Sequence, residues 1–382
     1  MASRVLTTAS LLAIAVFSSY SILGLTHRNG WADKLNASDG GVVAFLPDTE
    51  ILARTHFTGI ARLDSIFTYA VRIFYSCVSG QLPALPLFSV YFAGQMIAML
   101  SLLVLEGMRQ GNKGTPFAYP ALWGAMYQCV PFGITIPIYC AAYLWLSPLA
   151  KYSKGPRRIE SLSMDSVQLY ATLPAVILGF VVPTILPALA APRIISLDQK
   201  QIFLIVWQFF PFFVSLAHRI SAFVAQKMGL VKADTTLGTK YQDAKEVYRQ
   251  IIYMSQVLHI AVFTVVFVPQ AAKVLFKVED TSSINPFTVF IPMSVISPHQ
   301  VSLAAEGFLA LLQWDMYGGC AGLFVLVSYL SGAASGLGAG LWTATKVLLR
   351  TILVGPGAAI LWAFWDRDEE ALAAVGVEKK DQ

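Results

Sequence analysis

Long apolar runs follow one another along almost the whole chain. A helix needs about 20 mostly apolar residues to cross the hydrocarbon core of a bilayer, and nine segments approach that length. The pattern predicts an all-α fold: a polytopic transmembrane helical bundle of about nine spans, or seven or eight if the first or second segment does not cross. The nine segments are 5–25, 59–79, 86–106, 120–146, 168–191, 201–223, 248–268, 305–331 and 343–364.

The composition agrees with this prediction. Of the 382 residues, 56% are hydrophobic and only 13% are charged, whereas a soluble domain carries about 25% charged residues. We therefore expect one integral membrane domain over residues 1–382, ending in a polar, solvated tail over 365–382. We interpret 5–25 as a retained first span rather than a signal peptide, because its apolar run is long and lacks a small-x-small cleavage site.

The basic residues lie in short loops, which suits membrane orientation and gives no support for nucleic-acid binding. With nine spans, the basic loops 147–166 and 224–249 fall on the same side as the N-terminus, and the positive-inside rule makes that side cytoplasmic. On this count Arg109, Lys113, Lys273 and Lys277 fall on the opposite side, against the rule. Loop 26–57 is then lumenal, and we expect a multi-pass protein of the endoplasmic reticulum.

The lumenal loop contains a match to an N-glycosylation signal. Asn36 is followed by Ala37 and Ser38, which is the Asn-x-Ser pattern of a glycosylation acceptor. We therefore expect a glycoprotein modified at Asn36.

Several common catalytic motifs are absent from the sequence. It has no GxxxxGK[ST] phosphate loop, no GxSxG elbow, no HExxH and no Asp-rich DDxxD motif. The four cysteines lie inside apolar segments without metal-ligand spacing. We therefore expect no metal site and no cofactor. The acidic run 366–370 follows the last span, where a solvated tail is the ordinary outcome.

The polar residue placed deepest in an apolar segment is Asp315. A carboxylate inside a membrane costs at least a few kcal/mol unless it faces the protein interior and has a partner. Burial favours the protonated form of a carboxyl group, so Asp315 is a candidate Brønsted acid. The structural alternative is a hydrogen-bonded packing carboxyl between helices. Gln313, Trp314 and Tyr317 surround it in sequence.

Other polar residues fall in or at the ends of the apolar segments. Asp64 lies near the start of the second segment, and Arg72 follows on the same helical face; a salt bridge is the structural alternative. Glu106 ends the third segment, where a solvated interfacial carboxylate is the simpler interpretation. His259 lies mid-span, either as a hydrogen-bonded core histidine or as a substrate contact.

Three stretches taken together resemble a known family. They are 57–64 (FTGIARLD), 105–112 (LEGMRQGN) and 312–315 (LQWD). Their order and the chain length resemble fungal integral-membrane proteins of meroterpenoid clusters, including the membrane terpene cyclases of the ascochlorin, ascofuranone and macrophorin pathways. The resemblance extends roughly from residue 50 to 365.

The resemblance implies a metal-independent cyclisation of a prenyl chain attached to an aromatic or epoxycyclohexenone head group. An acid would protonate a terminal epoxide or alkene, and the resulting cation would close onto internal double bonds or a hydroxyl group. Asp64, Glu106 and Asp315 occupy the acidic positions of the three stretches, and which of them donates the proton stays open. Residues expected to contact the substrate are Trp314, Tyr317, His259, Arg72 and Gln313.

Two other functions fit the same residues. Intramembrane acids, a histidine and broken helices also suit a small-molecule transporter or proton-coupled carrier. A non-catalytic membrane scaffold for pathway enzymes is the third hypothesis. The expected partners are the lipid bilayer, a prenylated small-molecule substrate and, for the scaffold, other enzymes of the pathway.

Overall fold

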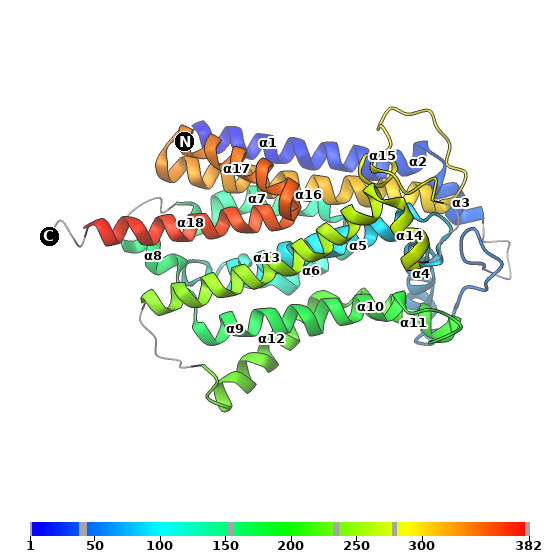
Figure 1. Cartoon of the computed structure of the whole chain (residues 1–382), viewed down its shortest axis with the longest axis horizontal. Coiled ribbons are helices and arrows are strands. Elements are labelled where there is room, and N and C mark those ends of the chain that lie inside the picture. Colours follow the sequence, from blue (N-terminus) through cyan, green and yellow to red (C-terminus); the bar gives the residue numbers. More distant parts are fainter. Residues whose placement is uncertain (1, 38–43, 152–155, 232–236, 277–280, 379–382) are drawn as a thin grey trace.

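The computed structural model describes residues 2–37, 44–151, 156–231, 237–276 and 281–378 of the chain. The expected all-helical bundle is confirmed. Within the described residues, extended pairing is limited to one isolated bridge between Phe45 and Leu52. The long helices lie roughly along one direction, and both chain termini lie at the same end of the bundle (Figure 1). We call this the terminal end, and the opposite end the α4 end.

Six helical passes connect the two ends of the bundle. Short π-helical turns join α1 to α2 and α9 to α10, and α11 and α12 meet at a bend of 70°. The passes are α1 (Ala2–Ser19), α5 (Ala84–Met108), α9 (Ser166–Val176) with α10 (Val182–Ala188), α11 (Leu197–Trp207) with α12 (Phe210–Lys227), α13 (Leu237–Phe267) and α16 (Ala304–Ser335).

The segment 120–146 folds as a hairpin that enters and leaves at the terminal end. α6 (Pro120–Cys129) runs inward, the chain breaks at Val130 and Pro131, and α7 (Phe132–Leu146) runs back. The Phe117 ring before α6 lies 5.0 Å from the Tyr143 ring near the end of α7. After α7, the Ser147 hydroxyl donates to the Asn112 side chain, just beyond the end of α5. The segment is therefore not a crossing.

The last two helices form a second hairpin of the same kind. α17 (Leu337–Val354) begins where α16 ends, and α18 (Pro356–Glu378) returns to the terminal end (Figure 1). The tip contacts Gln95, near the middle of α5. The Gln95 Oε1 accepts from the N–H groups of Gly357 at 3.0 Å and Ala358 at 3.2 Å, and its Nε2 donates to the Val354 carbonyl at 3.3 Å. One side chain thus satisfies the backbone on both sides of the break.

The structure contains fewer candidate spans than the nine apolar segments. By length and composition, six helices of the described residues can cross a membrane, one of which is α17, or seven if the bent pair counts as one span. Seven is the lower of the expected alternatives. The nine expected segments included 120–146 and 343–364, which hold hairpin tips, and 59–79, whose helix is not among those six. Hydropathy measures the length of an apolar run, and it does not reveal that the run reverses direction.

The hairpins also change the distribution of positive charge. Arg109 Nη1 donates to the Leu162 carbonyl at 2.7 Å, and the Gln110 N–H donates to the Ser163 carbonyl at 3.1 Å. The loop after α5 therefore lies at the terminal end with loop 147–166. Arg109 and Lys113 were expected on the other side, so their position removes two of the four exceptions to the positive-inside rule. Lys273 of α14 (Pro269–Phe276) remains at the α4 end, and Lys277 lies outside the described residues.

Short helices cover both ends of the bundle. At the α4 end lie α2 (Leu25–Arg28), α3 (Trp31–Ala37), α4 (Ala61–Ser79), α14 (Pro269–Phe276) and α15 (Pro286–Phe290) (Figure 1). At the terminal end lie α8 (Pro156–Leu162) and the 3₁₀ turns Gln110–Asn112, Pro116–Ala118 and Pro148–Ala150.

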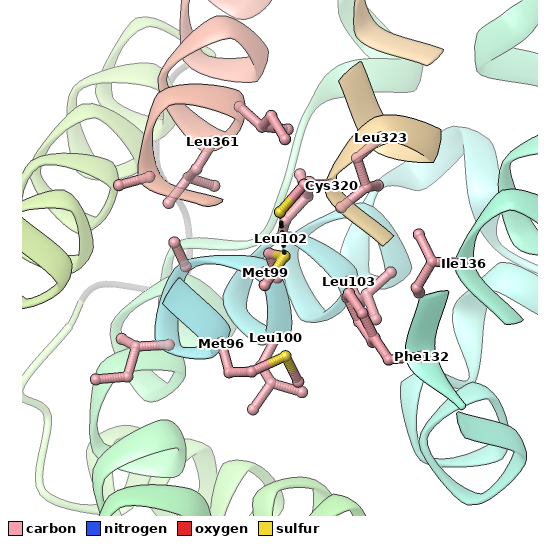
Figure 2. Close-up of a cluster of buried hydrophobic side chains, with 14 of the residues drawn as sticks. Met96, Met99, Leu100, Leu102, Leu103, Phe132, Ile136, Cys320, Leu323 and Leu361 are labelled. Atoms are coloured by element: carbon pink, nitrogen blue, oxygen red, sulfur yellow. Dashed lines mark hydrogen bonds between the residues drawn. The ribbon is translucent and has the colours of Figure 1, made fainter. Parts of the chain in front are cut away.

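The middle of the bundle is a packed apolar core. Figure 2 shows side chains of α5, α7, α16 and α18 meeting around Met99 and Leu103. Phe132 from the first hairpin and Leu361 from the second are both at most 3% exposed. Cys320 of α16 lies with its sulfur 3.6 Å from the Met99 sulfur. The two hairpins therefore fill the space between α5 and α16.

The tail expected to be solvated is partly buried. Residues 365–378 continue α18, and Arg367 and Asp368 are 6% and 2% exposed. They are buried because they pair with charged groups at the end of α5, as described below. Only residues 379–382 of the expected tail lie outside the described part of the chain.

Gln95→Leu is expected to destabilise the protein by about 2–4 kcal/mol, because it leaves two N–H groups and one carbonyl without a partner in the membrane interior. Unfolding in detergent micelles measures the change. The control Met96→Leu is nearly volume-conserving at a buried neighbour and should cost less than about 1.5 kcal/mol. Equal stabilities of the two variants would contradict the role of Gln95.

Candidate active site

A cavity of about 430 Å³ lies beside the N-terminal half of α4. Its size falls within the range of small-molecule sites. Most of the lining residues carry a polar group, and two of them, Asp64 and Arg72, were singled out in the sequence. The other lining residues are Thr55, His56, Gly59, Ala61, Ser65, Thr68 and Tyr69.

The Asp64 carboxylate organises the turn that precedes α4. Its Oδ1 accepts from the N–H groups of Phe57 at 3.1 Å and Thr58 at 2.7 Å and from the Thr58 hydroxyl at 2.8 Å, and its Oδ2 accepts from the Gly59 N–H at 3.1 Å. Gly59 adopts a φ of +79°, which a residue with a side chain rarely tolerates. The FTG sequence thus folds back onto the carboxylate.

These donors determine the acidity of Asp64. The hydrogen bond from the Thr58 N–H, helped by the Thr58 hydroxyl and the N–H groups of Phe57 and Gly59, holds the pKa of Asp64 below its usual value, although burial acts in the opposite direction. Asp64 is 5% exposed. At neutral pH the Asp64 side chain is therefore a carboxylate. Its protonated form is a stronger acid than an ordinary aspartic acid side chain.

The wall opposite α4 is held by α11. Gln201 accepts from the Arg54 N–H at 2.7 Å and donates to the Leu52 carbonyl at 3.1 Å. The Thr68 hydroxyl of α4 donates to the Arg54 carbonyl at 3.0 Å. The segment that carries Thr55 and His56 is therefore fixed from two helices, which keeps the cavity open between them.

Arg72 extends the cavity along α4. It lies two helical turns beyond Asp64 and is 2% exposed. A helix rises 1.5 Å per residue, so the two side chains begin about 12 Å apart along the α4 axis. The cavity therefore offers a carboxylate near one end and a guanidinium group near the other.

Asp315 lies elsewhere, at the tip of the first hairpin. Its Oδ1 accepts from the Gly133 N–H at 2.7 Å. Gly133 is the second residue of α7, whose N-terminus has no side-chain cap from its own N-cap residue, Pro131. A Cβ atom at Gly133 would lie 2.7 Å from the Asp315 carbonyl oxygen, so the glycine permits this close approach. Asp315 therefore caps α7 from the neighbouring helix, where the helix dipole favours a negative group.

The neighbours of Asp315 donate to carbonyls around α15. Gln313 donates to Thr288 and Val289 at 3.0 and 2.9 Å. The Trp314 indole donates to the Met293 carbonyl at 3.0 Å, and the Tyr317 hydroxyl donates to the Phe290 carbonyl at 2.5 Å. These three candidate substrate contacts fasten segment 288–293 to α16, and none of them lines the cavity at Asp64.

His259 contacts the second hairpin. Its Nε2 lies 3.1 Å from the Ile352 carbonyl, in the last turn of α17. Its ring packs 4.3 Å from the Phe263 ring and 5.6 Å from the Tyr91 ring. The ring nitrogen therefore contacts a carbonyl group at the C-terminal end of α17, as Gln95 does at the tip of the same hairpin.

Glu106 belongs to a buried ion network at the terminal end. It pairs with Arg109 at 2.6 Å and with Arg367 at 2.7 Å, and it accepts from the Tyr143 hydroxyl at 2.6 Å. Asp368 pairs with Arg109 at 2.7 Å. Two carboxylates and two guanidinium groups therefore balance, which offsets the cost of burying each charge.

The network contains residues that we had not singled out. Arg109, Arg367 and Asp368 are all at most 6% exposed. The sequence could have indicated the Glu106–Arg109 ion pair, because residues three apart on a helix are neighbours. The Arg367 and Asp368 contacts had no local signal, because the acidic run 366–370 has the composition of a solvated tail.

Two further expectations concern modification and metals. Asn36 is exposed on α3 at the α4 end, and Ser38, which completes the glycosylation signal, lies outside the described residues. Among the residues that the structure describes, no three His, Cys, Asp or Glu side chains are grouped as metal ligands.

Of the proposed site residues, only Asp64 and Arg72 line the cavity. Glu106 and Asp315 each lie at a separate place with partners of their own. The cavity adds His56, Thr55, Thr68 and Tyr69, which the sequence gave no reason to select. A fixed carboxylate in a cavity can transfer a proton to or from a bound molecule, and it can stabilise a positive charge on that molecule.

Asp315→Asn is expected to fold as the wild type does, because the amide oxygen can accept the Gly133 N–H, whereas Asp315→Leu should lose about 0.5–2 kcal/mol of stability with the cap. Thermal unfolding in detergent compares the two. Activity of Asp315→Asn should stay within a few-fold of wild type. A well-folded Asp315→Asn variant that is inactive would instead make Asp315 the proton donor.

Comparison with known proteins identifies the family. The CtvD domain model matches residues 7–372. The chain is 27% identical over 327 residues to terpene cyclase ascI of Acremonium egyptiacum, which covers 82% of this chain and 79% of that protein. It is 24% identical over 309 residues to terpene cyclase penA of Penicillium crustosum, covering 80% and 78% of the two chains.

A third relative covers nearly the whole chain. Terpene cyclase ctvD of Aspergillus terreus is 23% identical over 370 residues, which is 94% of this chain and 98% of that protein. No solved structure matches. The expected relation to fungal terpene cyclases is confirmed, and the chain belongs to the CtvD domain family.

Proposed function

We propose that this protein is a membrane-bound terpene cyclase of fungal meroterpenoid biosynthesis, and that it closes rings on a prenylated small molecule after protonation. The names of its relatives support cyclase activity, and the long apolar helices support a membrane protein. The observation that supports a particular site for this reaction is the cavity lined by Asp64. The proposed location is the endoplasmic reticulum membrane.

In this proposal Asp64 is the group that transfers the proton. Protonated Asp64 gives its proton to the oxygen of a terminal epoxide, whose carbon–oxygen bond opens, or to a terminal alkene. The carbocation is attacked by an internal double bond, which forms the ring. Loss of a proton from the last cation, to the Asp64 carboxylate or to water, completes an isomerisation with no net change in protons.

The surroundings of Asp64 suit this role. An epoxide and an alkene are weak bases, so protonating them requires a strong acid, and hydrogen-bond donors strengthen a carboxyl group as an acid. After the transfer, the fixed carboxylate lies close to the cation that it has produced and stabilises it without rearranging. The Asp-rich motif that binds a diphosphate is absent from the sequence, so the proposal uses no metal ion.

Other residues receive supporting roles. Arg72, at the far end of the cavity, would hold an oxygen-bearing head group while the prenyl chain extends toward Asp64. Glu106 would keep α5 and α18 together, and Asp315 would keep the first hairpin in place. Both carboxyl groups would affect stability more than chemistry.

Asp64→Asn should lower turnover of an epoxidised prenylated precursor by at least about 100-fold, since general acid–base groups contribute roughly 10²–10⁴-fold. Product is measured in microsomes and divided by folded protein. The matched control is Glu50→Gln, which removes an exposed carboxylate that does not line the cavity. Equal activity of all three proteins would refute the assignment of Asp64.

The pH dependence of turnover tests the role of Asp64 a second time, without replacing its side chain. Because the pKa of Asp64 is lowered, its protonated fraction falls about tenfold for each pH unit above that pKa, and kcat/KM should fall with it. Thr58→Val removes one donor to the carboxylate, which raises the pKa of Asp64 and shifts the profile to higher pH. An unshifted profile would contradict proton donation by Asp64.

A further inference from the structure

Two faces of α4 have different surroundings. Asp64, Thr68, Val71 and Tyr75 follow one another at intervals of three and four residues, so they share one face of the helix. The N-terminal part of this face lines the cavity, which extends to Arg72, and its C-terminal part packs into the protein through Val71 and Tyr75, which are 0% and 5% exposed. The opposite face carries large apolar side chains that the described protein leaves exposed.

We call this opposite face the outer face of α4 and define it by Leu63, Ile66 and Tyr69. Their exposed fractions are 39%, 55% and 44%. The three residues recur at intervals of three along the helix, so they share one side of it, on which the charged Arg62 is also exposed. Exposed apolar residues in such a stripe mark an interaction site or a lipid contact.

α4 contacts the bent pair of α11 and α12, which exposes apolar side chains of its own. Phe67, next to Ile66, lies with its ring 6.2 Å from the Phe209 ring at the bend between α11 and α12. Phe209 and Phe212 are 40% and 50% exposed on that bent pair, which is long and apolar enough to cross a membrane. The Phe67–Phe209 contact therefore places exposed apolar side chains of the bent pair next to α4.

The orientation of α4 fits a helix at the membrane surface. α4 lies across the α4 end of the bundle, with its axis turned away from the long helices (Figure 1). Its last turns are joined to the start of α5, where the Ser89 hydroxyl lies 3.3 Å from the Cys77 sulfur. An amphipathic helix in the interface buries its apolar face by about 5–10 Å at the boundary between headgroups and acyl chains.

We propose that the outer face of α4 lies in the bilayer surface and is the entrance through which lipid-dissolved substrates reach the Asp64 cavity. Tyr69 belongs to both the outer face and the cavity lining, so it lies on the boundary between the two. An amphiphile in the bilayer would slide past Tyr69 with its polar group entering the cavity. The substrate route rests on the proposed function, whereas the membrane position of α4 does not.

Depth measurements test the membrane position. Ile66→Cys and Thr55→Cys are made with Cys129→Ser, because Cys129 is the exposed native cysteine. Both are labelled with an environment-sensitive fluorophore and reconstituted in phosphatidylcholine vesicles that contain nitroxide lipids. Position 66 should be quenched at least threefold more than position 55. Equal quenching would overturn the proposal, whether or not the protein is a cyclase.

Kinetics test the entrance. Ile66→Asp places a charge on the outer face and should raise KM for a vesicle-dissolved precursor at least fivefold, while kcat stays within twofold. Ile296→Asp, at an 81% exposed position at the same bundle end, should change KM less than twofold. An unchanged KM in Ile66→Asp would overturn the entrance. No turnover by any protein, with the quenching difference intact, would count against the cyclase and leave α4 in the bilayer.

Discussion

The structure depends on one constraint: every backbone N–H and carbonyl group inside a membrane must find a partner within the protein. Continuous helices meet this requirement by themselves, but two hairpin tips and one bend do not. Side chains from neighbouring helices complete them. Gln95 serves the tip at Gly355, Asp315 serves the start of α7, and Gln128 donates to the Gln208 carbonyl at the bend between α11 and α12 at 3.0 Å.

This constraint changes the interpretation of polar residues in apolar segments. Such residues are expected to be functional because burying a polar group in a membrane costs free energy. Here, however, most of them hydrogen-bond to backbone groups. Gln313, Trp314, Tyr317 and His259 all contact carbonyl groups. The interior that they stabilise is closely packed, as Figure 2 shows around Met99. The cavity that Asp64 borders lies outside this packed interior, at the α4 end of the bundle.

The sequence predicted the helical membrane bundle and the family, because apolar runs and short motifs are local features. It also placed Asp64 and Arg72 together, since they share a face of one helix. The hairpins could not be predicted, because 120–146 and 343–364 are as apolar as true crossings. The pairing of Asp368 with Arg109 joins residues far apart in the chain, and no local pattern distinguishes such a buried charge from a solvated one.

The central claim is that 120–146 reverses direction inside the membrane, around a tip capped by Asp315. Spin labels at Tyr119→Cys and Leu146→Cys, which replace side chains that are 59% and 54% exposed, allow the distance between the two ends to be measured by pulsed electron paramagnetic resonance. A continuous helix over this segment would separate them by about 40 Å. The hairpin predicts a distance below about half that helix length. A distance near that of the continuous helix would contradict the hairpin and the capping role of Asp315.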